Sequence, residues 1–184
     1  MEDNKDSRIG ESEQYEKTGY LTEPYRIFHL RDCKEQRFDF HYHDFYKIIY
    51  FVDGRVDYKV EGKTYHLKPY DFVLVGANVI HKPEIDETVP YERYIIYLSE
   101  DFLAGSNEKG DSLKYCFEEA DRQQSRVVHF SPESYEELVG CLLRMEQIEA
   151  QREAYMNDML LKSAFIEFMV LFNRTAIGQP KAYI

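Results

Sequence analysis

The sequence predicts a mainly β domain that is followed by helices. Short runs rich in β-branched and aromatic residues extend from Tyr25 to about Leu98, and the pattern changes to helical spacing after Ser99. Sixteen tyrosines and twelve phenylalanines, with no tryptophan, favour strand-rich packing. The length of 184 residues fits one compact domain. We therefore expect a small all-β sandwich or barrel over residues 20–98 and a helical segment over residues 99–184.

The first nineteen residues, 1–19, are polar and rich in charge, with almost nothing to bury. They predict a mobile N-terminal arm. The alternative is that this arm folds over the mouth of a pocket.

Two turn signals predict hairpins within the β part. Asp53-Gly54 and Glu61-Gly62 each separate two β runs by two residues. The first turn would place Lys47 opposite Val60, and the second would place Tyr58 opposite Tyr65. The resulting interior face would carry Ile49, Phe51, Val56, Tyr58, Val60, Tyr65 and Leu67.

Parity along the strands then decides which polar residues point inward. Lys47 shares the interior face, and so do His41 and His43 if no bulge intervenes, whereas His66 falls on the solvent side. His81 follows the next buried run. A closed β fold could therefore bring three imidazoles to one cavity, although each could instead be a core histidine hydrogen-bonded to tyrosines or backbone.

The remaining histidines, His29 and His129, have no partner in these motifs. We expect them to be packing or surface residues.

The C-terminal half predicts two short helices and two long ones. The short helices lie near Asp101 and over residues 112–121, and the long ones over residues 132–151 and 155–174. Ser131 followed by Pro132 is a good start for the first long helix, which is apolar on one stripe only.

The second long helix is apolar on more than one face. The sheet can cover one face, and a second copy of the chain is the simplest cover for the other. This predicts a homodimer whose interface contains Phe165, Phe168, Met169 and Phe172. The alternative is that both faces pack inside one monomer.

Composition excludes several classes of function. A net charge of −11 repels phosphate backbones, so we expect no DNA binding by this chain alone. The three cysteines form no CxxC pair, and neither a signal peptide nor an apolar run long enough for a bilayer is present. These features predict a reduced, cytoplasmic protein with no membrane contact, and we expect no cofactor.

Two motifs give the chain a resemblance to cupins. The first consists of His41, His43, Lys47 and Gly54, within HYHDFYKIIYFVDG, and the second of Pro69, Tyr70, Asp71 and His81. More narrowly, the chain resembles the N-terminal sensor domain of AraC-type bacterial transcription regulators, because RYIIYLSEDFL is similar to the last strand and short helix of that domain. The resemblance covers residues 25–184.

The resemblance implies a fold and a function. The implied fold is a cupin-like β-barrel, a double-stranded β-helix or jelly roll, followed by two long antiparallel helices. The implied function is ligand sensing and dimerisation, and the helix-turn-helix domain that reads DNA in this family would be absent from this chain. The implied partners are a second copy and a small-molecule effector.

Two residues depart from the cupin pattern. Lys47 stands where metal-binding cupins place a glutamate, so we predict no metal; if one is bound, its ligands would be His41, His43 and His81. Tyr70 stands where glycine usually makes the turn, which predicts a turn of another type because positive φ is uncommon for tyrosine.

The expected ligand site consists of His41, His43, Lys47, Tyr58 and His81. Together these residues would orient a small polar effector, either a sugar or a carboxylate-bearing metabolite. Lys47 could instead extend to the mouth of the barrel and pair with an acid there.

Two other functions remain open from the sequence. One is a metal-dependent cupin enzyme, an isomerase or a dioxygenase, in which histidines hold the metal. The other is a purely structural dimerisation module whose pocket is filled by its own side chains.

Overall fold

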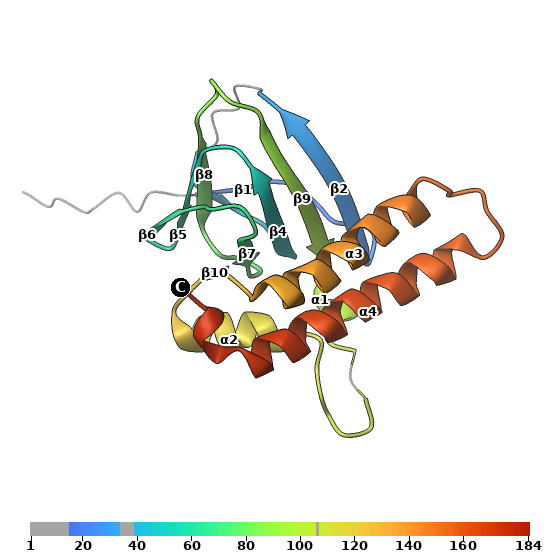
Figure 1. The fold of residues 1–184 in the computed structure, drawn as a ribbon. Coiled ribbons are helices and arrows are strands. Elements are labelled where there is room, and N and C mark those ends of the chain that lie inside the picture. Colours follow the sequence, from blue (N-terminus) through green and yellow to red (C-terminus); the bar gives the residue numbers. More distant parts are fainter. Residues whose placement is uncertain (1–14, 34–38, 106) are drawn as a thin grey trace, which may run out of the picture.

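The computed structural model describes residues 15–33, 39–105 and 107–184, and Figure 1 shows their arrangement. Two five-stranded sheets face each other. The first sheet has the strand order β1-β3-β8-β5-β6 and the second has the order β10-β7-β4-β9-β2. The strands are β1 (Glu16–Lys17), β2 (Tyr25–Asp32), β3 (His41–Tyr42), β4 (Tyr46–Asp53), β5 (Val56–Val60), β6 (Lys63–His66), β7 (Phe72–Val75), β8 (His81–Ile85), β9 (Tyr91–Leu98) and β10 (Val127–Val128).

The turn between β5 and β6 is the predicted hairpin. Glu61 and Gly62 both have positive φ, 46° and 81°, as a two-residue turn of this kind requires. The register pairs Val60 with Lys63 and Tyr58 with Tyr65. The second hairpin prediction is therefore confirmed.

The first hairpin prediction is wrong. β4 pairs with β7 and β9 in the second sheet, whereas β5 pairs with β6 and β8 in the first. The chain crosses between the sheets at Asp53-Gly54, where Gly54 has a φ of 128° and an added Cβ would lie 3.1 Å from the carbonyl oxygen of Pro90. The turn signal marked a corner between two layers, so Lys47 does not face Val60.

The predicted interior face is nevertheless correct. The inward faces of the two sheets meet. The inward-pointing residues of β4 therefore share one core with those of β5, although these two strands do not pair. This core contains all seven predicted interior residues: Ile49, Phe51, Val56, Tyr58, Val60, Tyr65 and Leu67.

A second core lies between the second sheet and the helices. Alternate residues of β4 point to opposite sides, so Ile49 and Phe51 enter the core between the sheets, and Ile48 and Tyr50 enter the core under the helices. The molecule therefore has three layers, and β4 is buried on both faces.

The mainly β class with helices in the C-terminal part is confirmed, but the predicted closed barrel is not found. Within the described ranges, strand pairing joins no strand of one sheet to a strand of the other. The layers are held together by side chains of the shared core instead.

The described residues after β9 contain four α-helices, where the resemblance implied two long ones and the helical spacing predicted two short and two long ones. They are α1 (Glu100–Leu103), α2 (Tyr115–Gln123), α3 (Pro132–Glu149) and α4 (Asn157–Gly178), and a short 3-10 helix covers Pro180–Ala182. α3 and α4 lie side by side in opposite directions (Figure 1). α4 begins two residues later than predicted and runs four residues further, and Tyr155 lies in the connection before it.

The residues predicted to form the dimer interface lie elsewhere. Phe165, Phe168, Met169 and Phe172 are fully buried in the core between α4, the other helices and the second sheet. Side chains covered within one chain cannot contact a second copy, so this assignment is wrong. The exposed apolar residues of α4 are Met159, Leu160, Ile166 and Ile177.

The turn at Tyr70 also differs from the prediction. Tyr70 has a φ of 78°, and the amide of Asp71 donates to the carbonyl of Lys68 at 3.0 Å, which closes a tight turn. The Tyr70 ring stacks on Tyr135 of α3 with a centroid distance of 4.5 Å. The stacking contact helps to hold the tyrosine in a conformation that glycine adopts more readily.

Part of the predicted mobile arm forms a strand. Residues 1–14 lie outside the described part of the chain, but β1 pairs in parallel with β3, and Lys17 contacts Asp44 at 2.6 Å. Within the described ranges, no helix combines the length and the apolar character needed to cross a bilayer.

Candidate functional site

Three histidines of the first sheet meet in the interior. His41 lies on β3 and pairs in register with His81 at the start of β8, and His43 follows β3 directly. Their ring centroids lie 4.4 to 5.0 Å apart, and their exposed fractions do not exceed 8%. One nitrogen from each ring lies within 4.8 Å of the others. The structure therefore brings together the three imidazoles that the sequence singles out.

Lys47 reaches this cluster from the second sheet. Its residue is 7% exposed, and its Nζ atom lies 3.0 Å from Nε2 of His81. Among the described residues, no acid pairs with this ammonium, so the alternative in which Lys47 extends to an acid at the barrel mouth does not describe the observed contact. The side chain joins the two sheets through His81.

Backbone carbonyls fix the orientation of the three imidazole rings. Nδ1 of His41 lies 2.8 Å from the carbonyl oxygen of Asp39, Nδ1 of His81 lies 2.9 Å from that of Val79, and Nδ1 of His43 contacts the carbonyl of Thr18. A carbonyl oxygen only accepts, so each Nδ1 must carry the hydrogen. In the neutral rings the lone pair is then on Nε2.

The inward-facing nitrogens are therefore hydrogen-bond acceptors. Nε2 of His81 accepts from Lys47. Nε2 of His43 is buried and has no hydrogen-bond partner among the described residues. A buried acceptor without a partner is costly, so Nε2 of His43 is open to a hydrogen bond from a donor.

Burial keeps these histidines neutral. It lowers the pKa of His43 to about 4, with a further contribution from the charge of Lys47. Burial and the same charge hold the pKa of His81 well below its ordinary value, and burial lowers the pKa of His41 as well. The three rings are therefore uncharged at neutral pH.

Lys47 titrates near neutrality. Complete burial lowers the pKa of its ammonium to about 7, because the charged form loses its hydration. The cluster thus combines three neutral acceptors with one donor that can gain or lose a positive charge at physiological pH.

Tyr58 closes one side of the cluster. It lies on β5 and is 1% exposed, and its ring is nearly parallel to that of His81 with a centroid distance of 6.1 Å. All five residues expected to form the ligand site thus lie together, although their role in binding stays a prediction.

The sequence reasoning missed several residues of this interior. On β9, Tyr97 pairs in register with Lys47, and its ring contacts Phe45, which in turn stacks on His43. Arg93 shares the inward face of β9, is 9% exposed and pairs with Asp32 at 3.1 Å. Parity along β9 could have identified both, because Arg93, Ile95 and Tyr97 alternate along the strand as Lys47, Ile49 and Phe51 do along β4.

The other histidines lie outside the cluster. His66 is exposed and contacts Asp57 at 2.6 Å, which agrees with its predicted place on the solvent side. His129 contacts the buried carboxylate of Asp71 at 2.7 Å, and His29 lies between two glutamates at the edge of the second sheet. Both therefore have partners that the sequence motifs did not reveal.

The arrangement does not fit the metal centre of a cupin enzyme as it stands. Three Nε2 atoms are a suitable set of metal ligands, but the carboxylate that would complete the set is replaced by Lys47. Lys47 also uses the Nε2 lone pair of His81 and, when it is protonated, brings a positive charge next to the imidazoles. A metal would have to displace or neutralise this lysine.

The comparisons with known proteins identify the family. Residues 24–169 match the AraC-like ligand-binding domain, so the chain belongs to this family. No curated protein matches the chain.

Similar solved structures include a cupin-family protein with a double-stranded β-helix fold from Methanocaldococcus jannaschii. Its sequence identity is 17%, the match covers 41% of this chain and 70% of that chain, and the TM-score is 0.36. A putative mannose-6-phosphate isomerase from Ralstonia eutropha has 15% identity, 41% and 75% coverage and a TM-score of 0.38. A cupin 2 conserved barrel domain protein from Salinispora arenicola has 16% identity, 44% and 68% coverage and a TM-score of 0.37. These TM-scores are too low to support an argument about this chain, so the assignment rests on the family match.

Proposed function

We propose that this chain is the effector-sensing and dimerising part of a cytoplasmic transcription regulator, and that its effector binds at the cluster of His41, His43, His81 and Lys47. The family match to a ligand-binding domain supports the sensing role. The observation that carries the proposal is the buried Nε2 atom of His43, which has no partner among the described residues although it lies beside Lys47 and two more imidazoles.

The hydrogen-bonding character of the cluster favours one of the two expected effector classes. Nε2 of His43 needs a donor, and a hydroxyl group can donate to it while it accepts from Lys47. A carboxylate only accepts, so Lys47 would support it but the imidazole lone pairs would oppose it. We therefore propose a small hydroxyl-rich effector, such as a sugar, over a carboxylate-bearing metabolite.

A thermal-shift screen tests this proposal. Polyhydroxyl compounds and matched carboxylates are added to the wild-type chain, where a ligand that binds the folded state raises the melting temperature. We expect stabilising compounds among the polyhydroxyl set, and we expect the stabilisation to disappear in Lys47→Met and His43→Phe. His66→Gln serves as the control because His66 is exposed and outside the cluster.

Two results would count against the effector site. If the stabilisation persists in both cluster variants, the compound binds elsewhere. If no compound of either class stabilises the wild type, the structural dimerisation module becomes the better explanation, because its interior needs no ligand.

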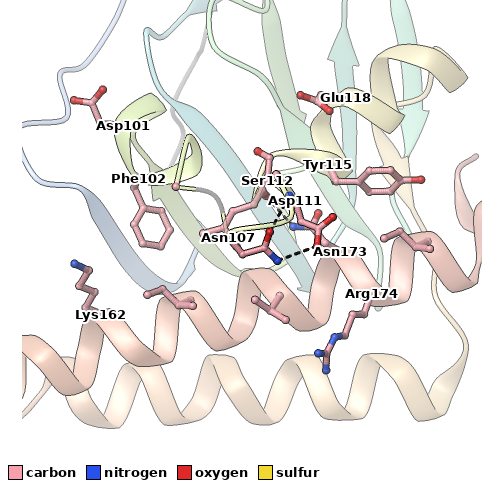
Figure 2. A pocket seen from close by; sticks show the side chains of 16 residues that line it. Asp101, Phe102, Asn107, Asp111, Ser112, Tyr115, Glu118, Lys162, Asn173 and Arg174 are labelled. Carbon is pink, nitrogen blue, oxygen red and sulfur yellow. Dashed lines mark hydrogen bonds between the residues drawn. The ribbon is translucent and has the colours of Figure 1, made fainter.

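Dimerisation is proposed through the exposed face of α4. Met159, Ile166, Val170 and Ile177 follow one another at intervals of seven, four and seven residues, which is the spacing of a coiled-coil seam. Three of them line a groove of about 890 Å³ between α4 and the segment from Asp101 to Glu118 (Figure 2). We propose that α4 of a second copy covers this face.

Charges around the groove agree with such a partner. Lys162 and Arg174 of α4 have no ion-pair partner in the described part of the chain, and neither do Asp101 of α1 and Glu118 of α2. A second copy would offer acids to these bases and bases to these acids, as a two-fold interface requires.

A metal-dependent cupin enzyme is the second candidate function. The three imidazoles within 4.8 Å of one another favour it. Lys47 opposes it, and the metal content of the wild-type chain separates the two candidates.

A further inference from the structure

His29 lies where α3 packs on β2 of the second sheet, outside the histidine–lysine cluster. It is on β2 and pairs in register with Tyr94 on β9. Its ring lies flat against the ring of Tyr94, with a centroid distance of 4.1 Å and an interplanar angle of 11°. The neighbouring strand therefore holds the imidazole in a fixed plane, with both ring nitrogens at its edges.

Each ring nitrogen of His29 meets a different carboxylate. Nδ1 lies 2.9 Å from Glu146 of α3, and Nε2 lies 2.9 Å from Glu92 of β9. An ionised carboxylate only accepts hydrogen bonds, so both nitrogens must donate. A neutral imidazole carries one hydrogen and would turn a lone pair towards one of the two acids. The arrangement is therefore built for an imidazolium ion.

The two glutamates support this protonation state, whereas the cation of Arg31 competes for one of them. Beyond the two glutamates, Arg31 on β2 contacts Glu92 at 3.6 Å, and the hydroxyl of Tyr94 donates to Glu146 at 3.0 Å. Tyr50 on β4 lies behind Tyr94, with a centroid distance of 6.3 Å. Partial burial lowers the pKa of His29, but the hydrogen bonds to Glu92 and Glu146 outweigh it, so the pKa lies above its ordinary value.

We propose that His29 is a proton-dependent clamp that fastens α3 to the second sheet. The imidazolium holds an acid from the sheet and an acid from the helix at once, whereas the neutral ring can hold only one of them. Loss of the proton therefore loosens the C-terminal half of α3.

The direction of the pH dependence follows from the raised pKa. A histidine that binds its proton more tightly in the folded state stabilises that state fully below its ordinary pKa, and this contribution is lost as pH rises through the folded-state pKa. The clamp is thus closed in mildly acidic solution and opens at alkaline pH. Because α3 packs along α4, the opening would reach the helix whose outer face is the proposed dimer surface.

Hydrogen exchange at pH 6 and pH 8 tests the clamp on the full chain. After correction for the intrinsic exchange rates, we expect the amides around Glu146 in α3 to lose protection several-fold between pH 6 and pH 8 in the wild type. In His29→Gln, which cannot carry the charge, these amides should be less protected at pH 6 and should not respond to pH. His66→Gln is the matched control, because His66 also contacts an acid but lies in the first sheet.

A second variant keeps the test independent of the folding of His29→Gln. Glu146→Gln retains the shape of the helix side chain and removes the helix carboxylate, so an NMR titration should find a lower pKa for His29 than in the wild type. Three results would each overturn the clamp. The protection of α3 in the wild type could be the same at pH 6 and pH 8, it could change equally in His29→Gln, or the pKa of His29 could be the same in Glu146→Gln as in the wild type. None of these readouts depends on an effector or on the dimer.

Discussion

The Nζ atom of Lys47, on β4 of the second sheet, lies 3.0 Å from the Nε2 atom of His81, on β8 of the first sheet. This contact spans the interior between the layers. It directs a donor at one of three imidazoles whose remaining inward nitrogens are acceptors. When it is protonated, the lysine brings a positive charge beside the three imidazoles.

Stability should depend on pH through Lys47. Burial lowers its pKa to about 7, so between pH 7 and its ordinary value the unfolded chain binds a proton that the folded chain lacks. The wild type should therefore gain stability as pH rises through this window, by at most about 1.4 kcal/mol per pH unit from this one group.

Urea denaturation of the wild type and Lys47→Met between pH 6.5 and pH 9 measures this effect. The variant has no charge to bury, so its free energy of unfolding should exceed that of the wild type most at the low end of the range. This advantage of the variant should shrink as pH rises, because only the wild type gains stability. A difference that stays constant with pH would mean that Lys47 titrates normally.

The assembly prediction compares an exposed residue with a buried residue of α4. Ile166→Glu places a charge on the proposed dimer surface, so the chain should stay folded but scatter light as a 22.0 kDa monomer. Phe168→Glu places a charge in the core and should unfold the protein, at a cost of more than about 3 kcal/mol.

Tyr155→Glu is the control for that experiment, because Tyr155 is 93% exposed but lies before α4 begins. It should remain a dimer. A wild type that is monomeric at micromolar concentration would contradict the proposed interface.

DNA binding is expected to be absent in this chain by itself. The net charge of −11 opposes a polyanion, and electrostatic attraction to phosphates supplies most non-specific affinity. Fluorescence anisotropy with labelled duplexes at physiological salt should show no binding at micromolar protein. Nanomolar affinity for any duplex would show that these residues read DNA themselves.

The sequence predicted the interior residues better than it predicted strand pairing. Alternation along a strand depends only on the backbone, so Lys47, Ile49 and Phe51 were assigned to the correct side. Pairing depends on which layers a turn joins, and Asp53-Gly54 has the same composition in a hairpin and in a corner between sheets. The convergence of His41, His43 and His81 followed from parity and from the motif resemblance together.

Helix packing was harder to predict for a similar reason. The apolar residues of α4 surround much of the helix, so composition indicates two covered faces without saying which partner covers each. The phenylalanines face the sheet, and the smaller stripe with Ile166 faces outward. The His29 contacts were not predictable, because Glu92 and Glu146 are distant in sequence. Glu92 meets His29 through the pairing of β2 with β9, and Glu146 meets it only after α3 packs on β2.

Metal content tests the central claim, that Lys47 takes the place of a metal among the three histidines. The wild type, Lys47→Glu and Lys47→Met are incubated with zinc or manganese, dialysed and analysed by mass spectrometry for bound metal. We expect the wild type to retain far less than one ion per chain and Lys47→Glu to retain one, because the new carboxylate completes the ligand set. Lys47→Met separates removal of the charge from addition of a ligand. One tightly bound ion per wild-type chain would contradict the account.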